Sequence, residues 1–145
     1  ALGDTAYLYS VHSTSYSISS PVDGITSISA DMQATGQIDR GVSVHTLTAR
    51  TSTANGTSVD SGASSSNGGV GHLHVTALSG PTTLDVDIED SANDSTFASL
   101  ISFTQVTTST TSERSTVSGT VDRYLRAAWT ISGTSYTFAV SFARR

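Results

Sequence analysis

The chain has 145 residues, of which 13% are charged, and its formal net charge is −5. The charged share is well below the roughly 25% of an average soluble domain, and the negative balance argues against a dedicated nucleic-acid binder, which needs a basic face. The lack of Cys excludes a disulfide framework and a Cys-ligated zinc site, and no apolar run approaches the roughly 20 residues that a membrane span needs.

The first forty-one residues predict β-strands that lack partners. Apolar and polar residues alternate over 6–12 and again over 15–19, and Pro21-Val22-Asp23-Gly24 predicts a turn. Residues 25–40 form a longer extended stretch that ends at Gly41. Because a β-rich unit of this length cannot bury its own apolar face, we expect it to complete a sheet with chain absent from this sequence or with another copy.

The remainder, 42–145, predicts a β-sandwich that is sufficient in itself. A strand is expected from Val42 to Leu47, followed by a polar loop over 50–71 in which Asn55-Gly56 is a hairpin signal. Firmer strands are predicted over 70–78, 83–89, 124–131 and 135–143, with further strands within 97–106 and 115–121. Ser132-Gly133-Thr134 is expected to turn the last hairpin.

Alternation in these strands assigns the inward-facing positions, with Trp129 as the core anchor. They are Leu73, Val75, Ala77, Leu84, Val86, Ile88, Leu125, Ala127, Trp129, Ile131, Tyr136, Phe138, Val140 and Phe142. Seven or eight strands at this spacing are typical of an antiparallel sandwich. The predicted fold class is therefore all-β: an antiparallel β-sandwich (Ig-like or jelly-roll) over 42–145, preceded by a partial β-segment over 1–41.

Two neighbouring outward positions, His72 and His74, are a candidate metal site. Imidazoles two residues apart on a strand share one face, and His45 or His12 could supply a third ligand. The alternative is a polar strand face turned to solvent or to an interface. Since no carboxylate or third His stands at a telling spacing, we assign no metal ligand here.

The acidic loop over 89–95 is a candidate calcium site through Asp90, Asn93 and Asp94. It lacks the EF-hand pattern, and Asp, Asn and Ser are also the residues that a turn between two strands uses for local side-chain-to-backbone bonds. A turn is the favoured interpretation.

No pattern indicates catalysis. Asp85, Asp87 and Glu89 share one strand face, where carboxylates are ordinarily solvated rather than paired across a cleft. No nucleophile elbow or phosphate-binding loop is present. The basic residues Arg123, Arg126 and Arg144-Arg145 could pair with acidic faces of neighbouring subunits, and they are too few and too dispersed to form a nucleic-acid groove. We assign no catalytic, cofactor-binding or metal-binding residue, and expect no enzyme.

Three passages of the first segment carry a resemblance to a known family. They are Gly3-Asp4-Thr5-Ala6-Tyr7-Leu8-Tyr9, Ser13-Thr14-Ser15-Tyr16-Ser17-Ile18 and Thr35-Gly36-Gln37-Ile38-Asp39-Arg40-Gly41. Through them, 1–41 resembles the second half of the major tail tube protein of tailed phages (siphophages). The rest resembles the sandwich that many tailed-phage proteins carry at the C-terminus, through Gly71-His72-Leu73-His74-Val75-Thr76-Ala77, Asp90-Ser91-Ala92-Asn93-Asp94-Ser95 and Gly119-Thr120-Val121-Asp122-Arg123-Tyr124-Leu125-Arg126.

The resemblance implies a virion structural protein. Subunits of that family form hexameric rings that stack into a tube, whose lumen lets DNA slide past a neutral or acidic lining. The implied partners are further copies, other virion proteins and DNA in passive contact, with no membrane. The implied location is the phage tail, assembled in the bacterial cytoplasm.

Two alternatives remain open for the function. One is a capsid decoration or head/tail fibre protein that docks through 1–41. The other is a carbohydrate-binding β-sandwich module.

Overall fold

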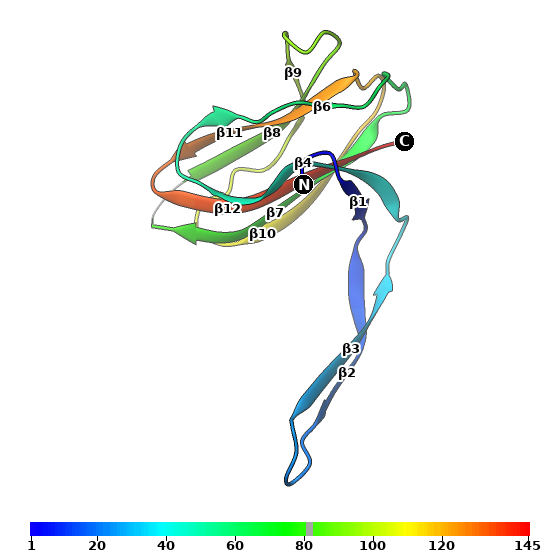
Figure 1. Ribbon diagram of the computed structural model, residues 1–145, viewed down its shortest axis with the longest axis vertical. Coiled ribbons are helices and arrows are strands. Elements are labelled where there is room, and N and C mark those ends of the chain that lie inside the picture. The colour runs from blue at the N-terminus through cyan, green and yellow to red at the C-terminus, as the bar shows by residue number, and fades with distance from the viewer. Residues whose placement is uncertain (81–82) are drawn as a thin grey trace. The chain divides into compact units, whose positions relative to one another are not determined.

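The structure is a computed structural model that describes residues 1–80 and 83–145 (Figure 1). The described residues form strands without any helix: β1 (Thr5–Leu8), β2 (Val11–Ser19), β3 (Ser27–Ala34), β4 (Asp39–Arg50), β5 (Ala54–Asn55), β6 (Val59–Asp60), β7 (Gly69–Ser79), β8 (Thr83–Ser91), β9 (Ala98–Ser102), β10 (Thr111–Val117), β11 (Tyr124–Ser132) and β12 (Ser135–Arg144). They divide into two compact units, which are described separately: Tyr9–Ile38, and Ala1–Leu8 together with Asp39–Arg145.

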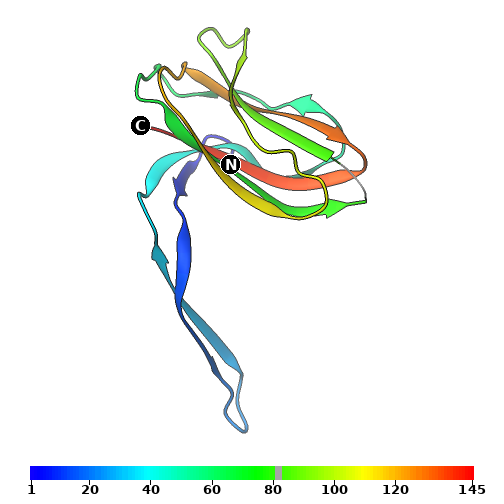
Figure 2. The same ribbon diagram turned by 180° about the vertical axis from the view of Figure 1, so that it is seen from behind.

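The larger unit is an antiparallel β-sandwich. Its first sheet has the strand order β1-β4-β12-β7-β10. Its second sheet has the order β5-β11-β8-β9, and β6 also pairs with β11. Figures 1 and 2 show the two sheets as the two layers of this unit, seen from opposite sides. The predicted all-β, antiparallel sandwich fold is confirmed.

The core lies between the two sheets and follows the predicted alternation closely. Trp129 is 4% exposed, and the side chains of Tyr136, Phe138 and Phe142 are buried on the facing strand β12. Burial of one large apolar side chain contributes roughly 1.5–3 kcal/mol, so each of these four residues stabilises the sandwich substantially.

One predicted inward position, Ala77, is exposed. The register between β12 and β7 shifts between Thr137 and Phe138, because Thr137 pairs with Ala77 while Phe138 pairs with Val75. Such a bulge changes which residues face the core beyond it. The prediction for Ala77 was wrong because a strict period of two cannot anticipate the extra residue.

The predicted boundary between residues 41 and 42 requires a correction. Strand β4 runs without interruption from Asp39 to Arg50, and β1 pairs with it, with Thr5 opposite Val42 and Leu8 opposite Asp39. Residues 1–8 and 39–41 therefore belong to the sandwich. Gly41 was read as the end of an element, but a Cβ there would overlap the carbonyl oxygen of Phe142 on β12.

Two predicted hairpins are also corrected. Asn55-Gly56 does not join a hairpin, because Asn55 ends β5, and β5 and the next strand, β6, both pair with β11 rather than with each other. Residues 132–134 connect β11 to β12, but these strands belong to different sheets, so the turn carries the chain from one layer to the other. The residues that favour a turn are the same whether the turn joins paired strands or strands of different sheets, so they do not reveal which strands pair.

The smaller unit is a two-stranded antiparallel ribbon of β2 and β3. Ile18 lies opposite Ile28 and Tyr16 opposite Ala30, with one register shift between Ser13 and Ser15. The turn predicted at Pro21 is confirmed by the bond from Gly24 N–H to the Pro21 carbonyl (3.3 Å). The expectation that the strands of residues 1–41 have no partners within the chain was therefore wrong, because β1 pairs with β4 and β2 pairs with β3. Among the described residues, no third strand pairs with the ribbon.

Candidate functional site

The ribbon carries an apolar face that the described residues leave uncovered. Side chains at alternate positions of a strand share a face, and directly opposite residues of paired strands do so too. We call the resulting set the apolar face of the ribbon: Tyr16, Ile18, Ile28, Ala30 and Met32. Its four large members are each 59–66% exposed. A group of large apolar side chains that are this exposed is typical of a surface that contacts another molecule.

The opposite face of the ribbon is made of hydroxyl groups. The Ser17 and Ser29 hydroxyls lie 2.7 Å apart across the two strands, and the Ser15 hydroxyl donates to the Asp31 carboxylate at 2.6 Å. Bonds between opposite side chains hold the register of the pair. The ribbon is therefore amphipathic, with one apolar side and one polar side.

A buried ionic cluster occupies the outer side of the first sheet. The Asp39 side chain is only 2% exposed and accepts hydrogen bonds from Arg114 (3.3 Å) and from Arg145 (3.0 and 3.3 Å). These donors, above all Arg145, hold the pKa of Asp39 below its usual range, and burial opposes them. No sequence pattern predicts this cluster, because 75 and 106 residues separate Asp39 from its two partners.

His72 and His74 lie beside this cluster, with ring centroids 5.9 Å apart. His72 was expected to face outward and is nonetheless buried, and its Nε2 has no hydrogen-bond partner among the described residues. The His74 Nδ1 lies 3.0 Å from the Ser112 hydroxyl. Burial, followed by the charges of His74 and Arg114, lowers the pKa of His72.

Of the two residues suggested as a third ligand for this pair, His45 has other partners in the same unit. His45 is stacked on Phe138 (centroids 4.5 Å apart), lies edge-on to Trp129 and accepts a bond from Arg50 Nε at 3.0 Å. Burial and the Arg50 charge lower its pKa. His12 lies in the ribbon. Over residues 1–80 and 83–145, no three His, Asp or Glu side chains are grouped to hold a metal ion.

In the acidic loop, side chains bond to nearby backbone. The Asn93 side-chain oxygen accepts from the Ser95 and Thr96 N–H groups, and the Ser91 hydroxyl accepts from the Asn93 N–H. The Asp90 carboxylate accepts from the Asp122 N–H at 2.7 Å. Asp94 has a positive φ of 57°. The bonds of Ser91 and Asn93 are those of a turn between β8 and β9, whereas Asp90 binds the backbone just before β11.

The carboxylates of β8 also have partners within the chain. Asp85 accepts both of its bonds from the Gln105 amide (2.9 and 3.0 Å). Glu89 pairs with Arg126 at 2.7 Å, and the Arg126 guanidinium lies 3.9 Å from the centre of the Phe97 ring. Asp87 shares their strand face, and its side chain is half-buried.

The other arginines considered for contacts with neighbouring subunits also have partners within the chain. The Arg123 guanidinium donates two hydrogen bonds of 2.6 and 2.7 Å to the Asp60 carboxylate, and these bonds lower the pKa of Asp60 to about 2. Arg144 donates to the Val121 carbonyl (2.7 Å), to the Asp122 carbonyl and to the Ser65 hydroxyl (3.2 Å). Arg145 binds Asp39.

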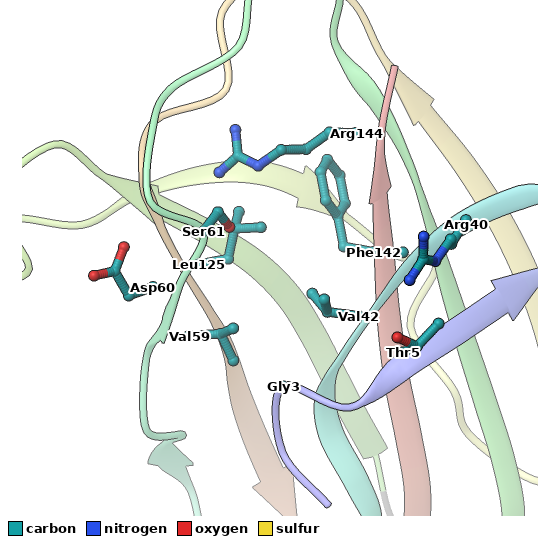
Figure 3. A pocket seen from close by; sticks show the side chains of 11 residues that line it. Gly3, Thr5, Arg40, Val42, Val59, Asp60, Ser61, Leu125, Phe142 and Arg144 are labelled. Carbon is teal, nitrogen blue, oxygen red and sulfur yellow. The ribbon is translucent and has the colours of Figure 1, made fainter.

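An open cleft of about 530 Å³ lies in the sandwich between the strands of the two sheets (Figure 3). Its apolar lining consists of Val42, Val59, Leu125 and Phe142. Its charged lining is Arg40, Arg144 and Asp60. Nothing in the sequence marks Arg40 as a site residue, because it is a single basic residue between Asp39 and Gly41.

Comparison with protein families, curated proteins and solved structures found no match for this chain. Among the described residues, no helix has the length and apolar character needed to cross a membrane.

Proposed function

We propose that the chain is a virion structural protein, a subunit of a phage tail tube that assembles with further copies of itself, and that the ribbon is the surface through which copies join. The observation that carries the proposal is the exposed apolar face of the ribbon, Tyr16, Ile18, Ile28 and Met32. The passages that resemble tail tube proteins supply the identity of the assembly.

Burial of the apolar face of the ribbon against another surface is favourable in free energy. A two-stranded ribbon by itself is marginally stable in water, and burial of each large apolar side chain contributes roughly 1.5–3 kcal/mol. Four such side chains on one face offer a large gain to any surface that covers them. The free edges of β2 and β3 also offer backbone groups to a further strand.

A second copy of the chain is the occupant that fits this face best. Residues 9–38 contain two carboxylates, Asp23 and Asp31, and neither Arg nor Lys. Two such ribbons repel each other only weakly, and each offers the other the same apolar face. Hexameric rings and a DNA-filled lumen follow from the resemblance alone.

Sedimentation of purified protein tests self-assembly. We expect the wild type to form concentration-dependent oligomers and the double variant Ile18→Ser/Ile28→Ser to sediment as a monomer. Leu47→Ser is the matched control, because Leu47 is also exposed (59%) but lies in the sandwich. Wild-type protein that stays monomeric at every concentration would refute the proposal.

The decoration or fibre alternative uses the same ribbon as a docking arm, so location must separate the two functions. Native phage particles labelled through the sandwich should carry the label along the tail. Label confined to the capsid would refute the tail tube function and support the decoration function.

A further inference from the structure

The lining of the cleft includes one arginine, Arg40, whose charge no carboxylate of residues 1–80 and 83–145 pairs with. Asp60 is held by both bonds from Arg123, so its charge is already matched. Arg40 forms no ion pair within residues 1–80 and 83–145. Arg144 donates to neutral oxygens, and the nearby carboxylates of Asp90 and Asp122 partly balance its charge, so Arg40 is the charge in the cleft that lacks a counterpart among these residues. An occupant of this cleft should therefore be acidic.

The floor of the cleft is apolar, so an occupant should also carry apolar side chains. Val42 and Phe142 belong to the first sheet, and Val59 and Leu125 to the second. Leu125 and Phe142 are buried, so the half-buried Val42 and Val59 are the apolar side chains of the floor that an occupant can reach. Figure 3 shows these four side chains together with Arg40 and Arg144 around the cleft. A segment that combines apolar groups with one carboxylate would satisfy both requirements.

The turn of the ribbon, residues 21–25, has this combination; we call it the tip. Val22 is fully exposed (100%), Ile25 is 91% exposed, and Asp23 lies between them. The bond from Gly24 N–H to the Pro21 carbonyl and the contact between the Ser20 and Thr26 hydroxyls (3.1 Å) fix the shape of the turn. A preformed turn loses little conformational freedom when it binds.

We propose that the tip of one copy binds in the cleft of another copy, with Asp23 beside Arg40 and with Val22 and Ile25 against the apolar floor. The inference rests on the self-assembly proposed above and adds a second contact to it. The two surfaces differ, so the contact is heterologous: every copy offers one tip and one cleft, and copies add in sequence until a ring closes or a filament grows.

A charge exchange between Asp23 and Arg40 tests this contact. Each single variant, Asp23→Arg and Arg40→Asp, should weaken self-association about tenfold or more, because like charges then meet in a partly desolvated cleft. An equimolar mixture of the two variants should recover most of the wild-type association, since each tip then meets a cleft of opposite charge. Recovery upon mixing also requires that the contact joins different copies.

Apolar variants provide an independent measurement. Val22→Ser/Ile25→Ser should weaken association to a similar extent, whereas Ile38→Ser, an exposed residue of the same ribbon (55%), should leave it unchanged. Near-ultraviolet circular dichroism should be the same for all variants, which separates loss of contact from loss of fold. A mixture that associates no better than its two components overturns the inference.

The outcomes distinguish this inference from the proposed function. If tip and cleft variants associate like the wild type while Ile18→Ser/Ile28→Ser is monomeric, the self-assembly stands and the tip contact is refuted. If the wild type itself never associates, both are refuted.

Discussion

Asp39 is a residue whose role depends on partners from distant parts of the chain. It is buried on the outer side of the first sheet, and Arg114 of β10 and Arg145, next to β12, converge on it. Buried charges persist only where such partners satisfy them. The cluster therefore ties β4, near one edge of the sheet, to β10 at the other.

Asp39→Asn should destabilise the sandwich by about 2 kcal/mol, because charge-assisted hydrogen bonds from two guanidiniums would be lost. Urea unfolding followed by the fluorescence of Trp129, the only tryptophan, measures the change. Asp85→Asn is the control, since the exposed Asp85 bonds only to a neutral amide, and it should change stability little. Equal effects of both substitutions would contradict the role given to Asp39.

The buried histidines should make stability depend on pH. The pKa values of His45 and His72 are lowered in the fold from their ordinary 6.5, so below pH 6.5 the unfolded chain binds protons that the folded chain does not. The free energy of unfolding should therefore be constant above about pH 7 and fall below pH 6.5, by at most about 1.4 kcal/mol per pH unit for each histidine.

Urea titrations at pH 7.5, 6.5 and 5.5 measure this dependence. His72→Gln should reduce the slope without removing it, because His45 still contributes. A free energy of unfolding that increases between pH 7 and pH 5.5 would show that the sign is wrong.

Buried apolar residues can be predicted from the sequence more reliably than buried polar residues. The alternation in β8, β11 and β12 predicted the core correctly, because a strand face packed on a sheet must be apolar at every second position. The same alternation placed His72 outside and could not show that the outer face is itself covered there. Nor could it show that His45 packs inside on Phe138.

At the scale of elements, strand β4 links the edge strand β1 to the central strand β12 of the first sheet. It pairs with β1 on one side and β12 on the other, and at Gly41 its backbone approaches β12 too closely for any Cβ. Sequence patterns predicted where strands lie but not which strands pair, because pairing is decided by contacts between residues that are far apart in the chain. This is why Asn55-Gly56 and Gly133 were assigned to hairpins that do not exist.

Gly41→Ala should destabilise the sandwich by roughly 1–3 kcal/mol, as overpacking against backbone does. Gly36→Ala is the matched control, because a Cβ at Gly36 meets nothing within 4 Å. Thermal unfolding monitored by circular dichroism compares the two. A Gly41→Ala midpoint equal to that of the wild type would mean that β4 can move away from Phe142.

The ribbon should be removable without loss of the sandwich. Leu8 and Asp39 are directly opposite each other in the pairing of β1 with β4, so residues 9–38 can be replaced by a two-residue Asn-Gly turn. We expect the shortened chain to keep its cooperative unfolding and to lose self-association. A shortened chain that unfolds without a cooperative transition would show that the sandwich needs the ribbon.

At the scale of the whole molecule, stability and assembly are divided between the two units. The sandwich contains the buried core, while the ribbon contains most of the exposed large apolar side chains. The low charge of the chain permits close packing of copies without strong repulsion. The amphipathic ribbon could be anticipated from the alternation over 15–19 and 25–34, but the cleft could not, because its lining comes from five separate strands and the segments beside them.

The place of β12 in the first sheet has a consequence for synthesis on the ribosome. This strand lies between β4 and β7, so the sheet has a gap at its centre until residues through Arg144 have left the exit tunnel. Pairings this distant in sequence also fold slowly. The sandwich must therefore form after translation of these residues, while the ribbon, whose strands are neighbours in sequence, can pair earlier.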